Sequence, residues 1–110
     1  MIDGMEGMQG GVVTGSGMSA IAVALLSCLQ AGDHIVAGDQ LYGRTLRMLS
    51  EDLPQLGISA ALADTSDMGA VAAALRPETR AILIEVVSNP TIRIADVAGI
   101  SRLARDAGVL

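Results

Sequence analysis

Short apolar runs alternate along the chain with longer helix-like segments, and this alternation most constrains the fold. The runs that predict strands cover residues 12–14, 35–37, 58–63 and 81–87. The segments that predict helices cover residues 18–30, 42–56, 68–75 and 94–107. No hairpin signal separates neighbouring strands, so the strands are expected to run parallel and to be joined by helices. The sequence therefore predicts a three-layer α/β fold, in which helices cover both faces of a mainly parallel sheet.

Charge and composition exclude several classes of function. The net charge is −5, and the seven basic residues, all arginines, form no basic patch, so we expect no nucleic-acid partner. The longest apolar run, residues 20–29, is too short to span a membrane, and the N-terminus carries acidic Asp3 and Glu6 where a signal peptide is basic. One Cys and one His do not make a zinc site. The sequence predicts a cytoplasmic protein with neither a metal nor a membrane partner.

The end of the sequence bears on domain organisation. A length of 110 residues suits one modest domain, and neither a repeat nor a linker divides it. Gly108 suits the end of the last helix, and the apolar Val109 and Leu110 that follow suit the start of a buried strand. We therefore expect residues 1–110 to be a fragment of a longer protein.

The first candidate site is the glycine turn before the helix expected at residues 18–30. Ser16 suits the N-cap of that helix, and the backbone amides of residues 16–19 could bind a phosphate. The pattern Gly15-x-Gly17-x-x-Ala20 also matches a dinucleotide-binding fingerprint, and Asp39 lies 24 residues after Gly15, where a ribose-binding acid is expected. A plain tight turn is the third interpretation.

Two further candidate segments follow predicted strands, at the edge of the sheet where ligands bind in α/β proteins. Tyr42, the only aromatic residue, suits either a surface position or stacking on a flat cofactor ring. Asn89, in the segment 85–91, offers both a hydrogen-bond donor and an acceptor, or belongs to an ordinary turn. Glu85 is unusual in an apolar strand, and we interpret it as a satisfied buried acid or as a brace for the site.

Together these segments resemble the Cys/Met-metabolism family of pyridoxal-phosphate enzymes, which includes cystathionine synthases and lyases, methionine γ-lyase and acyl-homoserine sulfhydrylases. The matching segments are TGSGMSAI at residues 14–21, AGDHIV at 31–36, LYGRT at 41–45, DTSD at 64–67 and EVVSNPT at 85–91. Where the family usually has Thr-Pro or Ser-Pro after the Glu, this chain has Val86-Val87.

The resemblance implies a role for each candidate residue. The backbone amides around Ser16, Gly17 and Met18 would bind the phosphate of pyridoxal 5'-phosphate. The ring of Tyr42 would stack on the cofactor and assist proton transfer at the substrate amine. Asn89 would lie near the ring hydroxyl oxygen, and Arg47 would lie near the carboxylate of a small amino-acid substrate.

The resemblance also implies a larger assembly. The 110 residues would be part of the large cofactor-binding domain of a fold-type I, aminotransferase-like enzyme, and the family is usually a homotetramer. The enzymes act on cysteine- or homoserine-derived amino acids as C–S lyases or γ-synthases. This chain contains no Lys to hold the cofactor covalently, so we do not expect it to catalyse transsulfuration alone. An NAD(P)-binding domain and a non-catalytic remnant are the alternative hypotheses.

Overall fold

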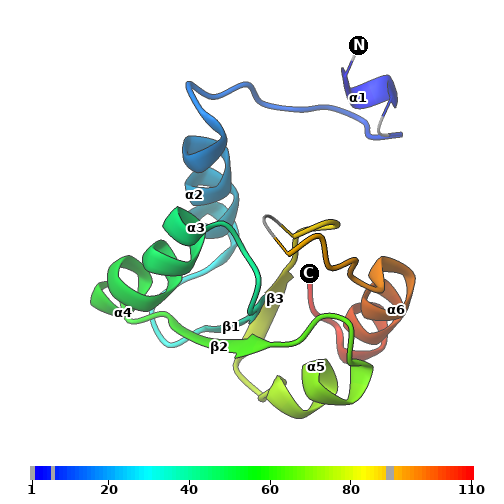
Figure 1. Ribbon diagram of the computed structural model, residues 1–110. Coiled ribbons are helices and arrows are strands. Elements are labelled where there is room, and N and C mark those ends of the chain that lie inside the picture. The colour runs from blue at the N-terminus through cyan, green and yellow to red at the C-terminus, as the bar shows by residue number, and fades with distance from the viewer. Residues whose placement is uncertain (1, 6, 89–90) are drawn as a thin grey trace.

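The computed structural model describes residues 2–5, 7–88 and 91–110 (Figure 1). Along the chain the elements are α1 (Ile2–Met5), α2 (Gly17–Cys28), β1 (His34–Gly38), α3 (Gly43–Arg47), η1 (Met48–Asp52), α4 (Leu53–Gln55), β2 (Ser59–Ala63), α5 (Met68–Ala74), β3 (Thr79–Leu83) and α6 (Val97–Ala107). From β1 onward, strands and helical segments alternate as the sequence predicts.

The three strands form a parallel sheet in the order β2-β1-β3. Within it, Ile35 of β1 lies level with Ala60 of β2 and Ala81 of β3. On the other side of β3, the Leu110 N–H donates to the Arg80 carbonyl at 3.0 Å and the Leu110 carbonyl accepts from the Ile82 N–H at 2.8 Å. This is the hydrogen-bond pattern of a parallel pair. Leu110 thus pairs with β3 through these two hydrogen bonds, but its side chain is 75% exposed and not buried as expected.

Helices pack on both faces of the sheet, which confirms the three-layer prediction (Figure 1). On one face, Ile35 and Ala37 contact a cluster that includes Leu25 of α2 and Leu49 of η1. On the other face, Val36 packs with Val71 of α5 and with Leu103 of α6. Successive residues of a strand point to opposite faces, so a central strand with apolar residues throughout is buried on both sides. All five residues of β1 are buried.

The helix predicted at residues 42–56 is one helical segment with a change of pitch. Its middle turn, η1, is π-helical, and Pro54 follows at the start of α4. Proline lacks an N–H and its ring crowds the carbonyl four residues earlier. The wider turn lies immediately before the proline, where an α-helical ladder would be interrupted.

Two predictions about the N-terminal part are wrong. Residues 12–14 form no strand, and the side chains of Val12 and Val13 are 86% and 93% exposed. A run of β-branched residues needs a neighbouring strand to complete its hydrogen bonds, and in Figure 1 this segment runs away from the sheet. The segment 18–30 is apolar nearly all round, which predicts a fully buried helix, but α2 rests on the sheet by one side only. Val23 and Leu26 on α2 are about half exposed.

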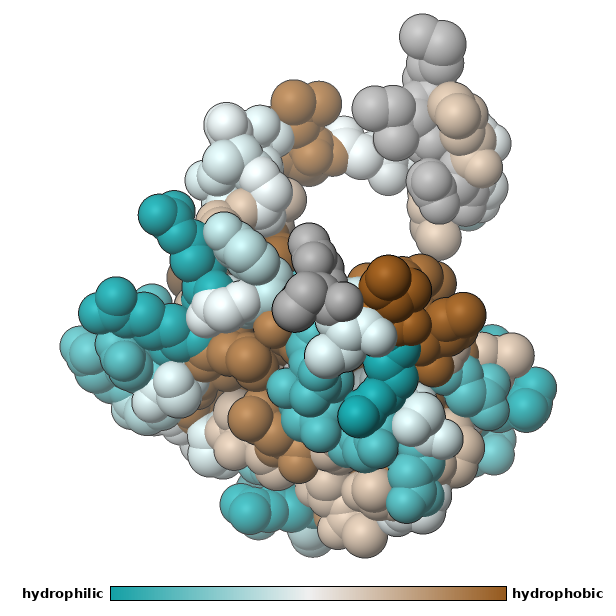
Figure 2. All heavy atoms as spheres, in the orientation of Figure 1, coloured by the Kyte–Doolittle hydropathy of each residue, from teal (hydrophilic) through white to brown (hydrophobic). Residues whose placement is uncertain are grey.

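The segment after β3 also departs from prediction. The strand ends at Leu83 instead of residue 87, and α6 begins at Val97 instead of residue 94. Between them, Val87 and Ile94 form an isolated antiparallel bridge. Apolar side chains of this segment gather on the surface shown in Figure 2, and they belong to Val86, Val87, Ile92, Ile94 and Val97. In the parts of the chain that the structure describes, no helix is long and apolar enough to cross a membrane.

Candidate functional site

The N-terminus of α2 presents two backbone donors. Ser16 is the N-cap, and its Oγ accepts the Ser19 N–H at 3.1 Å while its carbonyl accepts the Ala20 N–H at 3.0 Å. The N–H groups of Gly17 and Met18 donate to no acceptor among the described residues. Free amides at the start of a twelve-residue helix favour a bound anion.

The glycines of this turn leave space for a ligand. A Cβ atom added at Gly15 or Gly17 would meet nothing within 4 Å, and neither residue has a positive φ. Neither packing nor backbone conformation therefore requires glycine at these positions. Close approach of a ligand to the backbone is a third reason for glycine, and these residues fit a phosphate group at this position.

Helix α3 lies beside the start of α2. The hydroxyl of the buried Thr45 donates to the sulfur of Met18 at 3.7 Å, which joins the first turns of the two helices. A groove runs between them, with Met18 and Ser19 on one side and Arg44 and Arg47 on the other. Tyr42, the residue before α3, is thereby held at the same end of the molecule as the free amides of α2.

Tyr42 is the N-cap residue of α3, and its side chain is 52% exposed. Its backbone N–H donates to Oε1 of Glu85 at 2.9 Å, and Glu85 lies two residues beyond the end of β3. Glu85 thus has a hydrogen-bond partner on the segment that follows β1. The carboxyl ends of β1 and β3 are adjacent in the parallel sheet, so residues 43 apart in the sequence meet there.

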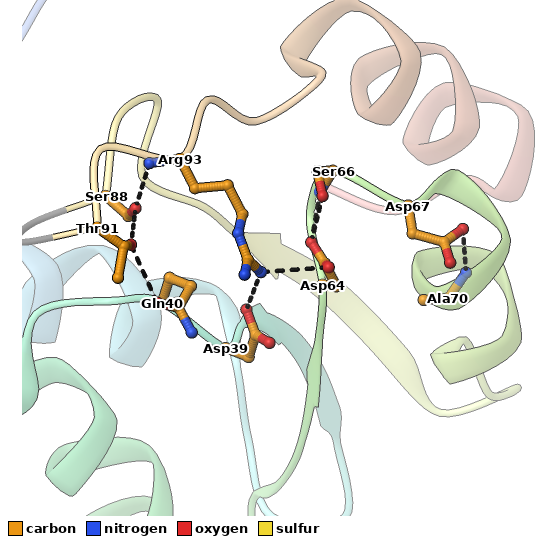
Figure 3. Close-up of polar contacts among 9 residues, drawn as sticks. All are labelled: Asp39, Gln40, Asp64, Ser66, Asp67, Ala70, Ser88, Thr91 and Arg93. Atoms are coloured by element: carbon orange, nitrogen blue, oxygen red, sulfur yellow. Dashed lines mark hydrogen bonds and ion pairs between the residues drawn. The ribbon is translucent and has the colours of Figure 1, made fainter.

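A group of polar side chains joins the segments that follow β1, β2 and β3 (Figure 3). Arg93 Nη1 lies 3.2 Å from Asp64 Oδ2 and 3.8 Å from Asp39 Oδ1. Hydrogen bonds from the Ser66 hydroxyl and backbone N–H lower the pKa of Asp64, and Arg93 adds to this effect. These contacts therefore favour the charged carboxylate of Asp64.

The dinucleotide interpretation finds little support in this geometry. No strand leads into the Gly15 turn, and the carboxylate of Asp39 faces Arg93. A dinucleotide fingerprint requires a strand directly before the glycine turn and an acid that is free to bind the ribose.

Ser88 and Arg93 are joined by two hydrogen bonds. The Ser88 N–H donates to the Arg93 carbonyl at 2.9 Å, and the Arg93 N–H donates to Ser88 Oγ at 2.8 Å. Thr91 Oγ1 lies 2.6 Å from Ser88 Oγ and donates to Gln40 Oε1 at 3.1 Å, which ties the loop to the end of β1 (Figure 3). Ile92 has a φ of 52°, a left-handed conformation that is strained for a β-branched residue.

The structure places five of the six predicted site residues. Ser16, Gly17, Met18 and Tyr42 lie around the starts of α2 and α3, as described above. Arg47 is the last residue of α3, on the same groove, and its Nε is paired with Glu51 Oε2 at 2.7 Å. Asn89 lies outside the described residues.

Sequence reasoning missed Arg93. Its only local signal is a single charged residue between Ile92 and Ile94, and its partners come from two other segments of the chain. Among the described residues, no group of His, Cys, Asp or Glu is arranged to hold a metal ion.

Comparison with known proteins gives the family. The model of the family described as Cys/Met metabolism PLP-dependent enzyme matches residues 1–110. Cystathionine gamma-lyase of Bacillus subtilis (strain 168) is 38% identical over 110 residues, which cover 100% of this chain and 29% of the relative. Methionine gamma-lyase of Arabidopsis thaliana is 41% identical over 107 residues, which cover 96% of this chain and 24% of the relative.

Solved structures agree. Cystathionine gamma-lyase from Lactobacillus plantarum, complexed with L-serine, superposes with a TM-score of 0.95 at 37% identity, over 99% of this chain and 28% of that one. An O-acetylhomoserine (thiol)-lyase from Campylobacter jejuni, which carries a pyridoxyl-lysine monophosphate, superposes with a TM-score of 0.83 at 33% identity, over 86% of this chain and 23% of that one. This chain thus spans about a quarter to a third of the length of its relatives. The match over all 110 residues, together with the α/β fold, shows that the chain belongs to the family of Cys/Met metabolism PLP-dependent enzymes.

Proposed function

We propose that residues 1–110 are the part of a pyridoxal-phosphate-binding domain that holds the phosphate and covers the ring of the cofactor. The observation that carries this proposal is the pair of free amides at Gly17 and Met18, beside open space and next to the helix that Tyr42 begins. The family is pyridoxal-phosphate dependent, and these residues fit its phosphate.

Each residue of the site has a task in this proposal. The amides of Gly17 and Met18 donate to the phosphate, and Ser16 keeps them aligned by capping α2. The ring of Tyr42 covers one face of the cofactor, and its hydroxyl moves a proton at the substrate amine. The side-chain amide of Asn89 binds the ring hydroxyl oxygen. Arg47 binds the substrate carboxylate once it releases Glu51. When bound, pyridoxal phosphate supplies an electron sink for charge that develops on the substrate.

The protein to which this part belongs would be a transsulfuration enzyme, either a C–S lyase or a γ-synthase that acts on small cysteine- or homoserine-derived amino acids. Its relatives of both kinds support this substrate class. We further propose a cytoplasmic homotetramer. The 110 residues contain no Lys, so the amine that holds the cofactor covalently would come from outside them.

The test is an NMR titration of the uniformly ¹⁵N-labelled chain with pyridoxal phosphate and, separately, with pyridoxal. We expect the amide signals of Gly17 and Met18 to shift with the phosphorylated compound only. Because the chain has no Lys, lysine adducts of the aldehyde cannot imitate binding.

Two glycine variants control this experiment. Gly17→Val places a side chain in the open space before the free amides and should abolish the shifts, while Gly10→Val, also in open space, should leave them unchanged. Equal shifts with pyridoxal, or no shift in any signal up to millimolar concentration, would contradict the proposal and favour a remnant without a ligand.

A further inference from the structure

We infer that Glu85 is a positioning residue for Tyr42. Its carboxylate holds the backbone of Tyr42 in place at the carboxyl end of the sheet and thereby limits where the tyrosine ring can lie. The contact that assigns this role is the 2.9 Å hydrogen bond from the Tyr42 N–H to Glu85 Oε1. The consequence for cofactor stacking rests on the function proposed above, whereas the positioning itself does not.

The backbone at Tyr42 is anchored on one side by Leu41, which is buried in the core, but its side chain makes few contacts among the described residues. Its side chain is about half exposed, and its hydroxyl has no hydrogen-bond partner among the described residues. Tyrosine offers no side-chain cap to the helix it precedes, and none is present. The Tyr42 carbonyl accepts the Leu46 N–H at 3.0 Å, so the helix holds one side of the residue. Glu85 holds the other.

The place of Glu85 in the fold suits this task. β1 and β3 are parallel neighbours, so residues that follow both strands meet at one edge of the sheet. Glu85 is half-buried there, and it lines one small polar cavity together with Gln40, Ser88 and Arg93. The segment that bears Glu85 is therefore tied to the segment after β1 at three points: through Tyr42, through the Thr91–Gln40 hydrogen bond and through the Arg93–Asp39 ion pair.

The negative charge of the Glu85 carboxylate also suits its position beside the first turn of a helix. The bond is charge-assisted, because an ionised oxygen accepts from a backbone N–H. A negative charge before the first turn of a helical segment is favourable, and the segment from Gly43 to Gln55 is helical throughout. A neutral acceptor of the same length would keep the hydrogen bond, and a shorter acid would not reach.

The chain allows a direct measurement, because Tyr42 is its only aromatic residue and it contains no Trp. Intrinsic fluorescence therefore reports on Tyr42 alone. We would compare time-resolved anisotropy and quenching by pyridoxal phosphate in wild type, Glu85→Ala, Glu85→Asp and Glu85→Gln. The matched control is Glu78→Ala, an exposed acid just before the opposite end of β3.

We expect Glu85→Ala and Glu85→Asp to increase the fast depolarisation of Tyr42 without ligand and to weaken quenching about tenfold, the effect of one hydrogen bond to a charged group. Glu78→Ala should behave as wild type, and Glu85→Gln, which keeps an uncharged and weaker hydrogen bond, should lie between wild type and Glu85→Ala. Circular dichroism spectra would identify any variant that fails to fold. If Glu85→Ala fails to fold, the comparison of anisotropy between Glu85→Asp and Glu85→Gln tests the positioning role.

The outcomes separate the two proposals. Changed anisotropy in Glu85→Ala and Glu85→Asp with no quenching in any variant would support the positioning role and refute cofactor binding. Unchanged anisotropy in folded Glu85→Ala and Glu85→Asp would overturn the positioning role, whether or not pyridoxal phosphate binds. A Glu85→Gln variant as mobile as Glu85→Ala would also overturn it.

Discussion

The protonation of His34 should control stability in mildly acidic solution. His34 begins β1, and its side chain is 1% exposed. Its Nδ1 lies 2.7 Å from Thr79 Oγ1, which also accepts the Arg76 N–H at 2.8 Å. Nε2 is buried and has no partner among the described residues. The hydrogen-bond partners present thus suit a neutral imidazole, because an imidazolium must donate from both nitrogens.

Burial lowers the pKa of His34, and the nearby Arg76 guanidinium lowers it further, while Glu78 acts in the opposite direction. The folded pKa therefore lies below 6.5, the ordinary value for the unfolded chain. Between these two values the unfolded state binds more protons, so the free energy of unfolding rises with pH. One group contributes a slope of at most about 1.4 kcal/mol per pH unit. The contribution of neutral His34 to the free energy of unfolding is complete above the pKa of the unfolded state, and it is lost as the pH falls below that value.

The assay is urea unfolding from pH 8 to pH 5, in wild type and in His34→Asn, whose amide can hydrogen-bond to Thr79 without titrating. The difference in unfolding free energy between the two proteins cancels the other titrating groups. We expect this difference to be constant above pH 7.5. Below about pH 6.5, the wild type should lose unfolding free energy relative to His34→Asn. A flat difference across the whole range, or one that favours wild type as pH falls, would refute the reasoning.

Three further predictions concern packing, capping and backbone conformation. Leu49→Ala should lower the free energy of unfolding by about 2–5 kcal/mol, because the Leu49 side chain is 2% exposed. The control Leu56→Ala, at a half-exposed residue, should change it by less than about 0.5 kcal/mol. Urea unfolding at pH 8 measures both. Asp96→Ala removes the acceptor of the Gly99 N–H at the start of α6 and should cost about 0.5–2 kcal/mol, with the loss of amide protection concentrated in the first turn by hydrogen exchange. Gly57→Ala should cost at least about 1–2 kcal/mol in the same unfolding assay, because φ is 78° and its Cβ would lie 3.1 Å from that of Ala31; no loss would contradict the left-handed conformation.

Local patterns predicted much of the fold. The continuous apolar run 35–37 indicated a strand buried on both faces, and β1 is that strand. Ser66 and Asp67 both suit the N-cap of the helix before Pro77, and in the structure the Asp67 carboxylate accepts the Gly69 and Ala70 N–H groups. Gly108 ends α6 with a φ of 68°. These features depend on residues close together in the sequence, so their spacing suffices to predict them.

Local patterns also located the glycine turn and Tyr42 of the candidate site, but not the contacts between loops that hold these residues in place. The glycine turn and Tyr42 are visible in the sequence because glycine, the N-cap serine and an isolated aromatic residue are local signals. Arg93 is not, because its role depends on Asp39 and Asp64 from two other loops. The apolar run at 12–14 was misread as a strand, since a strand exists only when another strand accepts its hydrogen bonds.

The sequence by itself determined the alternation of strands and helices, their parallel direction and the residue types of the glycine turn that we propose binds phosphate. Periodicity and caps act over a few residues, so local order is sufficient for these. Only the tertiary structure decided that β1 lies between β2 and β3, and hence that Glu85 reaches Tyr42 across 43 positions. The physical reason is that strand order is set by how the helices bury their apolar sides on the sheet, and no short segment of the chain contains that information.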